Sequence, residues 1–393
     1  MPESSLAPSA TTRYRPIEEY GVIGDMHTVA LVGTDGSIDW CCLPRFDAPS
    51  VFARLLDADA GGYFQICLDA EDATTKQFYW PETNVLVTRF LSEVGVGEVR
   101  DFMPVAGDAN ESSHRQIVRT VRAVRGRVPF RMACHPAFDY ARSDHTVNLS
   151  PRGVCFHGAE HGLSLSTDVD LEHEANGVTA RFTLDEGETT TFALRNMETG
   201  AACGPMYSDD DAEAAFRDTV TYWRDWLSQC TYTGRWREMV HRSALALKLL
   251  TYAPTGAIVA APTCSLPEEI GGIRNWDYRY TWIRDAAFTI YAFLRIGFTD
   301  EARAFMGFLS NICTASGEAE GPLQIMYGID GRTSLPETTL DHLDGYRQST
   351  PVRVGNGAYD QKQLDIYGEL IDAVYLYDKH GVPISHEMWQ SVR

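Results

Sequence analysis

Hydrophobic positions along this chain follow two different periods, and the change comes near residue 207. Before it, apolar residues alternate with polar or small ones over short segments. From Val128 to Cys134 every second residue is apolar, and Val178 to Leu184 repeats the pattern. A period of two is typical of a half-buried strand. Many such segments with turn signals between them predict an antiparallel β-sandwich over 14–207.

One hairpin can be located within this sheet-rich half. Two apolar segments, 29–32 and 37–40, flank the sequence Gly-Thr-Asp-Gly at 33–36. Asp-Gly tolerates a positive φ, which a tight turn between antiparallel strands requires. The sequence therefore predicts two paired strands joined at this turn.

After residue 207 the apolar spacing becomes three and four, which is the period of helices. An acidic run at 209–211 opens a linker helix, for which we take 208–235, because carboxylates suit the positive end of a helix dipole. The segment 286–298 is apolar on nearly every side, which predicts a helix enclosed by others. Four further helices are expected, at 239–252, 286–298, 301–312 and 361–377. These helices predict a second, helical domain over 236–393.

Composition bounds the class of protein. A chain of 393 residues with a net charge of -20 is long enough for two domains and disfavours nucleic acid or anionic membranes as partners. No segment approaches the ~20 apolar residues of a membrane span, and residues 1–13 read as a disordered tail rather than a secretory signal. The nine Cys are an odd number without metal spacing, so we expect free thiols and a cytoplasmic location.

The densest chemistry lies in one twelve-residue stretch, Arg274 to Asp285. It holds two Trp, two Tyr, three Arg and two Asp, directly before the apolar helix. Aromatic faces stack on the C–H patches of a pyranose, and Arg and Asp bind its hydroxyls. A buried turn filled by aromatics and ion pairs explains the composition equally well. For Arg284 and Asp285 the alternatives are an ion pair and a helix-start carboxylate.

Other candidate groups are weaker. Glu268 and Glu269 are adjacent, whereas glycoside hydrolysis with inversion needs two carboxyls roughly 6.5–9.5 Å apart across the bond. A loop-ordering role is therefore favoured over catalysis. His157 and His161 lie in strand-like sequence and do not predict a metal site. We expect neither a metal nor a cofactor.

Several long motifs, in one order, carry a resemblance to a known family. They are 17–25 (IEEYGVIGD), 35–40 (DGSIDW), 265–269 (SLPEE), 274–285, 324–331 (QIMYGIDG), 351–356 (PVRVGN) and 363–369 (QLDIYGE). With these motifs the chain resembles the bacterial branch of glycoside hydrolase family 15, the glucoamylase and trehalase family. The resemblance implies a multidomain β + α architecture. Its parts are an N-terminal β-sandwich, a helical linker and an (α/α)6 barrel of the six-hairpin glycosidase type.

The resemblance also implies a pocket at the N-terminal ends of the inner helices. By that match, Arg284 and Asp285 bind the hydroxyls of a terminal glucose, Trp282 flanks it and Tyr278 lies near the ring. The segment that holds Tyr359, Gln363 and Asp365 lines the pocket in relatives. We therefore expect these residues to bind substrate: Tyr278, Trp282, Arg284, Asp285, Tyr359, Gln363 and Asp365.

The implied reaction is exo-acting hydrolysis of an α-glucosidic bond with inversion. We expect a glucoamylase type that releases glucose from α-glucans or malto-oligosaccharides. The alternatives are a trehalase and a non-catalytic sugar-binding fragment. The acid and base motif Trp-Glu-x-Arg is not found before Arg393, and the helical half supplies only part of a barrel. We therefore expect a C-terminally truncated, inactive chain with no catalytic acid or base. The sequence leaves the oligomeric state open.

Overall fold

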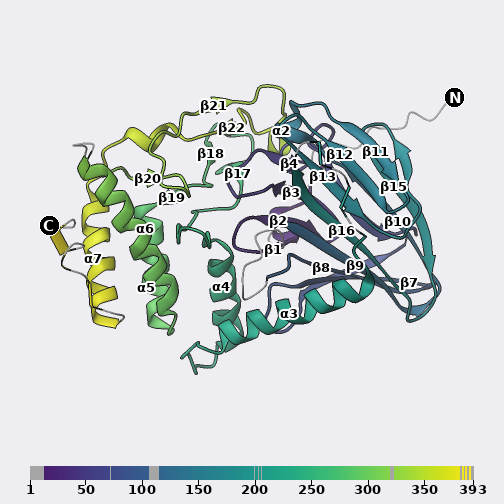
Figure 1. The fold of residues 1–393 in the computed structure, drawn as a ribbon, viewed down its shortest axis with the longest axis horizontal. Coiled ribbons are helices and arrows are strands. Elements are labelled where there is room, and N and C mark those ends of the chain that lie inside the picture. The colour runs from purple at the N-terminus through teal and green to yellow at the C-terminus, as the bar shows by residue number, and fades with distance from the viewer. Residues whose placement is uncertain are drawn as a thin grey trace.

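The structure is a computed structural model. It describes residues 13–70, 72–105, 115–198, 200–201, 203–204, 206–318, 323–380, 383–384, 386 and 389–390. The predicted disordered tail lies outside these residues except for Arg13. A sheet-rich N-terminal region is followed by a helical C-terminal part, as the change of period predicts (Figure 1).

The N-terminal region consists of two antiparallel sheets, each with eight strands. The first has the order β1-β2-β3-β5-β10-β15-β14, with β4 paired to β3. Its strands are β1 (Tyr20–Gly24), β2 (Val29–Gly33), β3 (Ser37–Cys42), β4 (Ser50–Phe52), β5 (Tyr63–Leu68), β10 (Val128–His135), β14 (Glu172–Glu174) and β15 (Gly177–Leu184).

The second sheet has the order β11-β12-β13-β16-β9-β8-β7-β6. Its strands are β6 (Thr74–Tyr79), β7 (Leu86–Ser92), β8 (Gly95–Phe102), β9 (Gln116–Gly126), β11 (Thr146–Ser150), β12 (Gly153–His157), β13 (His161–Ser166) and β16 (Thr189–Glu198).

The two sheets bury one face each against a common core. In β10 the even-numbered side chains are buried, and Phe130 is paired in register with Leu68 of β5 and Phe182 of β15. Phe90 and Val121 of the second sheet belong to the same core. The alternation read from the sequence therefore predicts the buried face correctly.

The predicted hairpin is also confirmed. Strands β2 and β3 pair across the turn at 33–36, where Gly36 has a φ of +77°. A Cβ atom on Gly36 would lie 2.1 Å from the carbonyl oxygen of Ile66, so both the backbone conformation and the available space require glycine.

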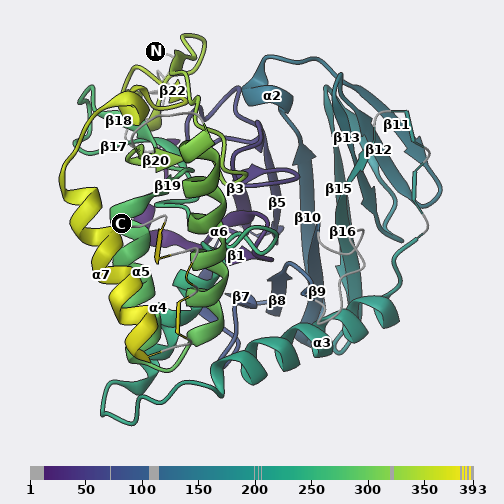
Figure 2. The same cartoon turned by 60° about the vertical axis from the view of Figure 1, so that its left-hand side comes forward.

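Helix α3 (Asp209–Leu227) leads from the sheets to the helical part and lies along the second sheet (Figure 2). Ser208 caps its first turn through the backbone N–H of Asp211, and the Asp211 carboxylate accepts from the Ser208 backbone N–H. Phe216 and Val220 pack against Phe102 and Val118 of the sheet. The helix is therefore an amphipathic cover of the sheet as well as a connection.

Helices α5 and α6 pack together, and α7 packs against both (Figures 1 and 2). The helices are α2 (Phe138–Ala141), α4 (Arg237–Leu249), α5 (Ile283–Arg295), α6 (Thr299–Glu318) and α7 (Asp365–His380), with short 3-10 turns η1 (Ile17–Glu19), η2 (Tyr346–Gln348) and η3 (Gly357–Asp360). Small strands between them are β17 (Cys264–Pro267), β18 (Asn275–Asp277), β19 (Thr281–Trp282), β20 (Met326–Tyr327), β21 (Thr338–Thr339) and β22 (Arg353–Val354).

Within the part of this chain that the structure describes, other helices do not enclose 286–298 as predicted. In α5, Ala286, Ile290 and Phe293 are buried, but Phe288 is 60% exposed and Tyr291 is 40% exposed. Apolar residues also lie exposed on neighbouring α7 and just before it. We call these residues the apolar face: Phe288, Tyr291, Leu364, Tyr367, Ile371 and Tyr375. Composition indicates that a helix is apolar but not whether a neighbour covers each side.

Polar contacts also join the two regions. The Asp47 carboxylate, buried in the loop between β3 and β4, pairs with Arg45 at 2.8 Å and with Arg332 of the helical part at 2.5 Å. The Trp40 indole N–H donates to the carbonyl oxygen of Pro262 at 2.9 Å. These contacts run from the sheet-rich region to the helical part, so the two regions pack against each other.

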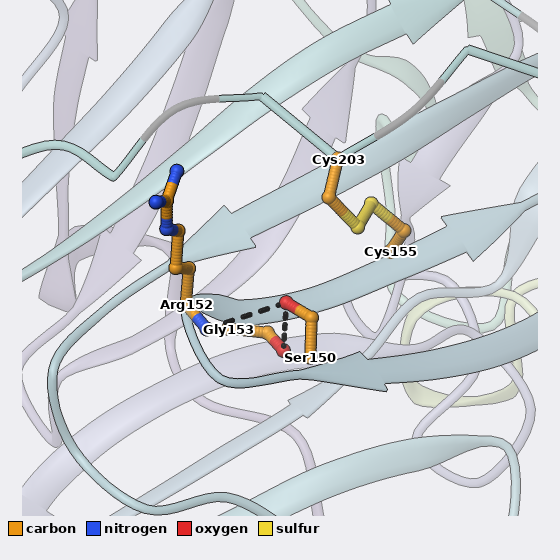
Figure 3. The surroundings of a disulfide bond; sticks show 5 residues. All are labelled: Ser150, Arg152, Gly153, Cys155 and Cys203. Atoms are coloured by element: carbon orange, nitrogen blue, oxygen red, sulfur yellow. Dashed lines mark hydrogen bonds between the residues drawn. A yellow bond between two sulfur atoms is a disulfide. The ribbon is translucent and has the colours of Figure 1, made fainter.

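The expectation that all cysteines are free is wrong. Cys155 on β12 forms a disulfide bond with Cys203, which lies between β16 and α3 (Figure 3). Their Cα atoms are 5.8 Å apart, within the usual range for a disulfide. The two residues are 48 positions apart, so spacing alone does not reveal the pair.

In the described part of the chain, no helix has the length and apolarity to cross a membrane.

Candidate functional site

The candidate site is built around the start of α5. Strand β19 pairs with β20 and delivers Trp282, whose extended backbone caps the helix, so that Arg284 and Asp285 fall in the first helical turn. The helix begins at Ile283 rather than at the predicted Ala286 because the backbone N–H of Ile283 donates to the carbonyl oxygen of Ile325 at 3.0 Å.

The start of α7 lies beside the start of α5. Arg284 forms an ion pair with the carboxylate of Asp365, the first residue of α7. The same guanidinium donates to the side-chain oxygen of Gln363 at 3.2 Å. Three of the predicted site residues are therefore in direct contact, although about 80 positions separate Arg284 from the other two.

This ion pair shifts the pKa of both partners. The hydrogen bond from Arg284 lowers the pKa of Asp365, and the Asp365 carboxylate in turn raises the pKa of Arg284. Both side chains are about 40% exposed, at 38% and 41%, so water screens the pair and its contribution to stability is small. Its main effect is to hold the guanidinium in one place.

The aromatic residues form the adjacent wall. The rings of Tyr278 and Trp282 are 5.4 Å apart at an angle of 49°. Partial burial, followed by the nearby Glu268 carboxylate, raises the pKa of Tyr278, and the Asp285 carboxylate acts in the same direction. Asp285 is exposed, and its effect on the Tyr278 pKa shows that the carboxylate lies near the Tyr278 hydroxyl. The partly exposed Tyr278 therefore lies near an accessible carboxylate, whereas Trp282 is only 7% exposed.

Tyr359 lies further along the chain, in η3, and is half-buried against the helical core. The turn that carries it is fixed by Asn356, whose side chain accepts from the Ala358 backbone N–H and donates to the carbonyl oxygen of Asp277 at 3.0 Å. The structure therefore ties the segment with Tyr359 to strand β18. Among the described residues, no hydrogen bond or ring contact joins Tyr359 to the other six predicted residues.

The sequence analysis did not single out the buried polar residues that support the candidate site. Asp277 and Arg279 form an ion pair at 2.7 Å, and both side chains are at most 1% exposed. Burial alone would lower the pKa of Arg279, but Asp277 and its other polar neighbours raise it, so the guanidinium stays charged. Asn275 and Asn356 are buried as well. The alternation of Asn275, Asp277 and Arg279 in the sequence is the pattern that could have predicted one buried polar face.

A hollow among the described residues lies away from these side chains. A cavity of about 680 Å³ on the outer side of the first sheet is lined by residues that include Tyr63, Arg131, His135, Glu172 and Arg181. None of its lining residues belongs to the predicted set. A shallow polar hollow on a sheet does not by itself identify a site.

Comparisons with known proteins identify the family of this chain. Residues 10–212 match the family "Trehalase-like, N-terminal", and residues 234–393 match "Glycosyl hydrolases family 15". The chain belongs to glycosyl hydrolase family 15. The family that the motifs predict is therefore confirmed.

Curated relatives named "Trehalase" match nearly the whole chain. The Mycolicibacterium smegmatis protein is 37% identical over 408 residues, covering 98% of this chain and 60% of that protein. The Mycobacterium tuberculosis protein is 35% identical, covering 96% and 58%. The Thermoplasma acidophilum protein is 38% identical, covering 92% and 61%. The family 15 chain thus spans about three fifths of the length of these relatives.

Proposed function

We propose that this family 15 chain belongs to an α,α-trehalose hydrolase. The observation that carries the proposal is the cluster at the starts of α5 and α7, where Arg284 and Asp365 pair beside the aromatic wall of Tyr278 and Trp282. Relatives named trehalase, at 35–38% identity, favour this substrate over the α-glucans of our first expectation. The alternative drawn from the sequence is therefore preferred to the glucoamylase type.

The residues have separate tasks in this proposal. The Arg284 guanidinium, held by Asp365 and Gln363, donates to the hydroxyls of one glucose ring. The exposed Asp285 carboxylate accepts from hydroxyls of the same ring. The partly exposed Tyr278 offers its ring to the C–H patches of this glucose, and the buried Trp282 ring supports it at 5.4 Å. Hydrolysis with inversion then requires an acid and a base carboxyl on opposite sides of the bond. We assign neither role to a residue of this chain.

We further propose that α4 to α7 belong to an (α/α)6 barrel, with the domain limits 14–207, 208–235 and 236–393. The apolar face of α5 and α7 supports this. Phe288 is 60% exposed and Tyr375 is 58% exposed, at positions that further barrel helices would cover. A cytoplasmic location remains a prediction, and the disulfide removes part of its basis.

A panel of two-glucose sugars tests the substrate. Binding of trehalose, maltose and isomaltose to the chain is measured by isothermal titration calorimetry, and glucose release from each is followed in parallel. Trehalose should bind most tightly. Stronger binding or faster hydrolysis of maltose would restore the glucoamylase reading. Because no acid or base is assigned to this chain, the order of the three affinities decides the substrate, and absence of glucose release does not count against a trehalase.

Substitution of Asp285 separates a ligand contact from a helix-start role. Asp285→Asn should weaken glucose and trehalose binding about 10- to 150-fold, because a hydrogen bond to a charged group contributes ~1.5–3 kcal/mol. The matched control is Asp300→Asn, since Asp300 occupies the first turn of α6 and pairs there with Arg303. Equal sugar affinity in both variants and the unsubstituted chain would show that Asp285 only begins a helix.

A further inference from the structure

Strand β18 and its flanking residues have two faces of different character. Asn275, Asp277 and Arg279 point into the protein, with exposures of 0%, 0% and 1%. Arg274, Trp276 and Tyr278 alternate with them and therefore lie on the opposite face of the extended chain. Tyr278 is the residue of this second face that already belongs to the proposed glucose site.

The buried face is fixed by hydrogen bonds on both sides. Arg279 donates to the carbonyl oxygen of Ala48 at 2.9 Å, in the loop from the N-terminal region. The Asn275 side-chain amide donates to the carbonyl oxygens of Ser349 and Pro351 at 3.1 and 3.2 Å. Asp277 accepts from the backbone N–H of Gly355 at 3.1 Å. The outer face therefore sits on a rigid support.

The outer face carries an ordered set of polar and aromatic groups next to Tyr278. The Tyr278 hydroxyl donates to Glu268 Oε1 at 3.4 Å, and Glu268 Oε2 pairs with Arg274 Nε at 3.0 Å. The Arg353 guanidinium lies 4.6 Å from the centre of the Trp276 ring and pairs with Glu337 at 3.0 Å. The Trp276 ring is half-buried, so part of it remains at the surface.

The spacing of this set suits a second sugar ring. Trp276 lies two residues from Tyr278, which is about 6.6–6.8 Å along an extended chain, and Glu268 joins the Tyr278 hydroxyl to Arg274. An aromatic ring, a guanidinium and a carboxylate are the groups that bind a pyranose. Arg274 is 66% exposed and Glu268 is 37% exposed, so both are within reach of a ligand.

We propose that Trp276, Arg274 and Glu268 form the platform that receives the second glucose of a two-glucose substrate, next to the ring held by Arg284 and Asp285. This inference rests on the proposed function and deepens it. It assigns selection between one-ring and two-ring sugars to the outer face of β18, whereas the helix starts hold the first ring.

Binding of one-ring and two-ring sugars to the same chain tests the platform. The affinities for glucose and trehalose are measured by calorimetry for the unsubstituted chain and for Trp276→Ala. The unsubstituted chain should bind trehalose about 10-fold more tightly than glucose, and Trp276→Ala should abolish this difference while leaving glucose affinity unchanged. Trp236→Ala is the control, because Trp236 is a surface Trp that, like Trp276, has a guanidinium near its ring, that of Arg235 at 4.4 Å from the ring centre.

Two further variants guard against misfolding of Trp276→Ala. Trp276→Phe keeps an aromatic ring and should retain most of the trehalose preference. Arg274→Ala removes an exposed side chain and should reduce trehalose affinity about 3-fold without changing the thermal unfolding midpoint.

Each outcome decides between the two proposals. Equal loss of glucose and trehalose affinity in Trp276→Ala, or no preference for trehalose in the unsubstituted chain, would overturn the platform and leave the glucose site standing. Failure of the unsubstituted chain to bind either sugar would overturn the proposed function and the platform together.

Discussion

Replacing Arg279 by leucine tests whether the buried pair beneath the site holds the fold together. Arg279→Leu leaves the Asp277 carboxylate buried without its cation, and Asp277 is 0% exposed. The substitution also removes the donor to the carbonyl oxygens of Phe46 and Ala48, at 3.4 and 2.9 Å. Arg279→Leu therefore removes interactions in both the N-terminal region and the helical part.

The expected cost follows from what remains behind. Removing one partner of a buried ion pair costs about 3–5 kcal/mol, because the other charge stays desolvated. A domain is stable by only about 5–15 kcal/mol, so Arg279→Leu should remove a large part of the free energy of unfolding. The double variant Arg279→Leu with Asp277→Leu should recover part of the loss, since no uncompensated charge is then buried.

Urea denaturation followed by tryptophan fluorescence measures these free energies. Arg303→Leu is the control, because Arg303 and Asp300 form an ion pair of the same 2.7 Å length at the surface, where the side chains are 56% and 66% exposed. Its loss should change the free energy of unfolding by less than ~1 kcal/mol. If Arg279→Leu behaves like Arg303→Leu, the reasoning from burial is refuted.

Two more predictions concern the N-terminal region. Reduction of the Cys155–Cys203 disulfide should lower the free energy of unfolding by about 4 kcal/mol, because it reopens a loop of 48 residues. Cys155→Ser should show the same loss and no further response to reductant. An unchanged urea midpoint on reduction would contradict this prediction. Burial lowers the pKa of four histidines below their ordinary 6.5, namely His27, His135, His145 and His161. Because the unfolded chain then binds more protons than the folded chain, the free energy of unfolding should fall as the pH drops from about 7 to 5. His161→Phe should flatten that decline, and an identical pH slope in this variant would exclude His161 as a contributor.

The sheets were predictable because their information is local. Alternation over Val128–Cys134 selects one buried face, and Gly36 marks a turn that no other residue fits without strain. The starts of α5 and α7 were less accurate, by three and four residues. Each start depends on a contact with a distant segment, such as that of Ile283 with Ile325.

The unsuccessful predictions share one physical cause, which is dependence on residues far away in sequence. The enclosed character predicted for α5 required neighbours over Phe288 and Tyr291, and sequence does not report neighbours. The disulfide joins residues 48 positions apart, where spacing carries no signal.

For the site, resemblance supplied the set of residues but not the pairing. The motifs named Arg284, Gln363 and Asp365 separately, and only the structure brings them into contact. The buried row of Asn275, Asp277 and Arg279 was visible as an alternation in the printed sequence. Its meaning depended on loop carbonyls from the other half of the chain, which no local pattern reveals.

The loop between β3 and β4 has a consequence for anyone who builds chimeras within this family. The carbonyl oxygens of Phe46 and Ala48 accept hydrogen bonds from Arg279, and the Asp47 carboxylate forms an ion pair with Arg332. Although it is encoded among the strands, it functions as part of the helical half. A hybrid that exchanges the sheets of one relative for those of another should therefore leave residues 43–48 with their original helical partner.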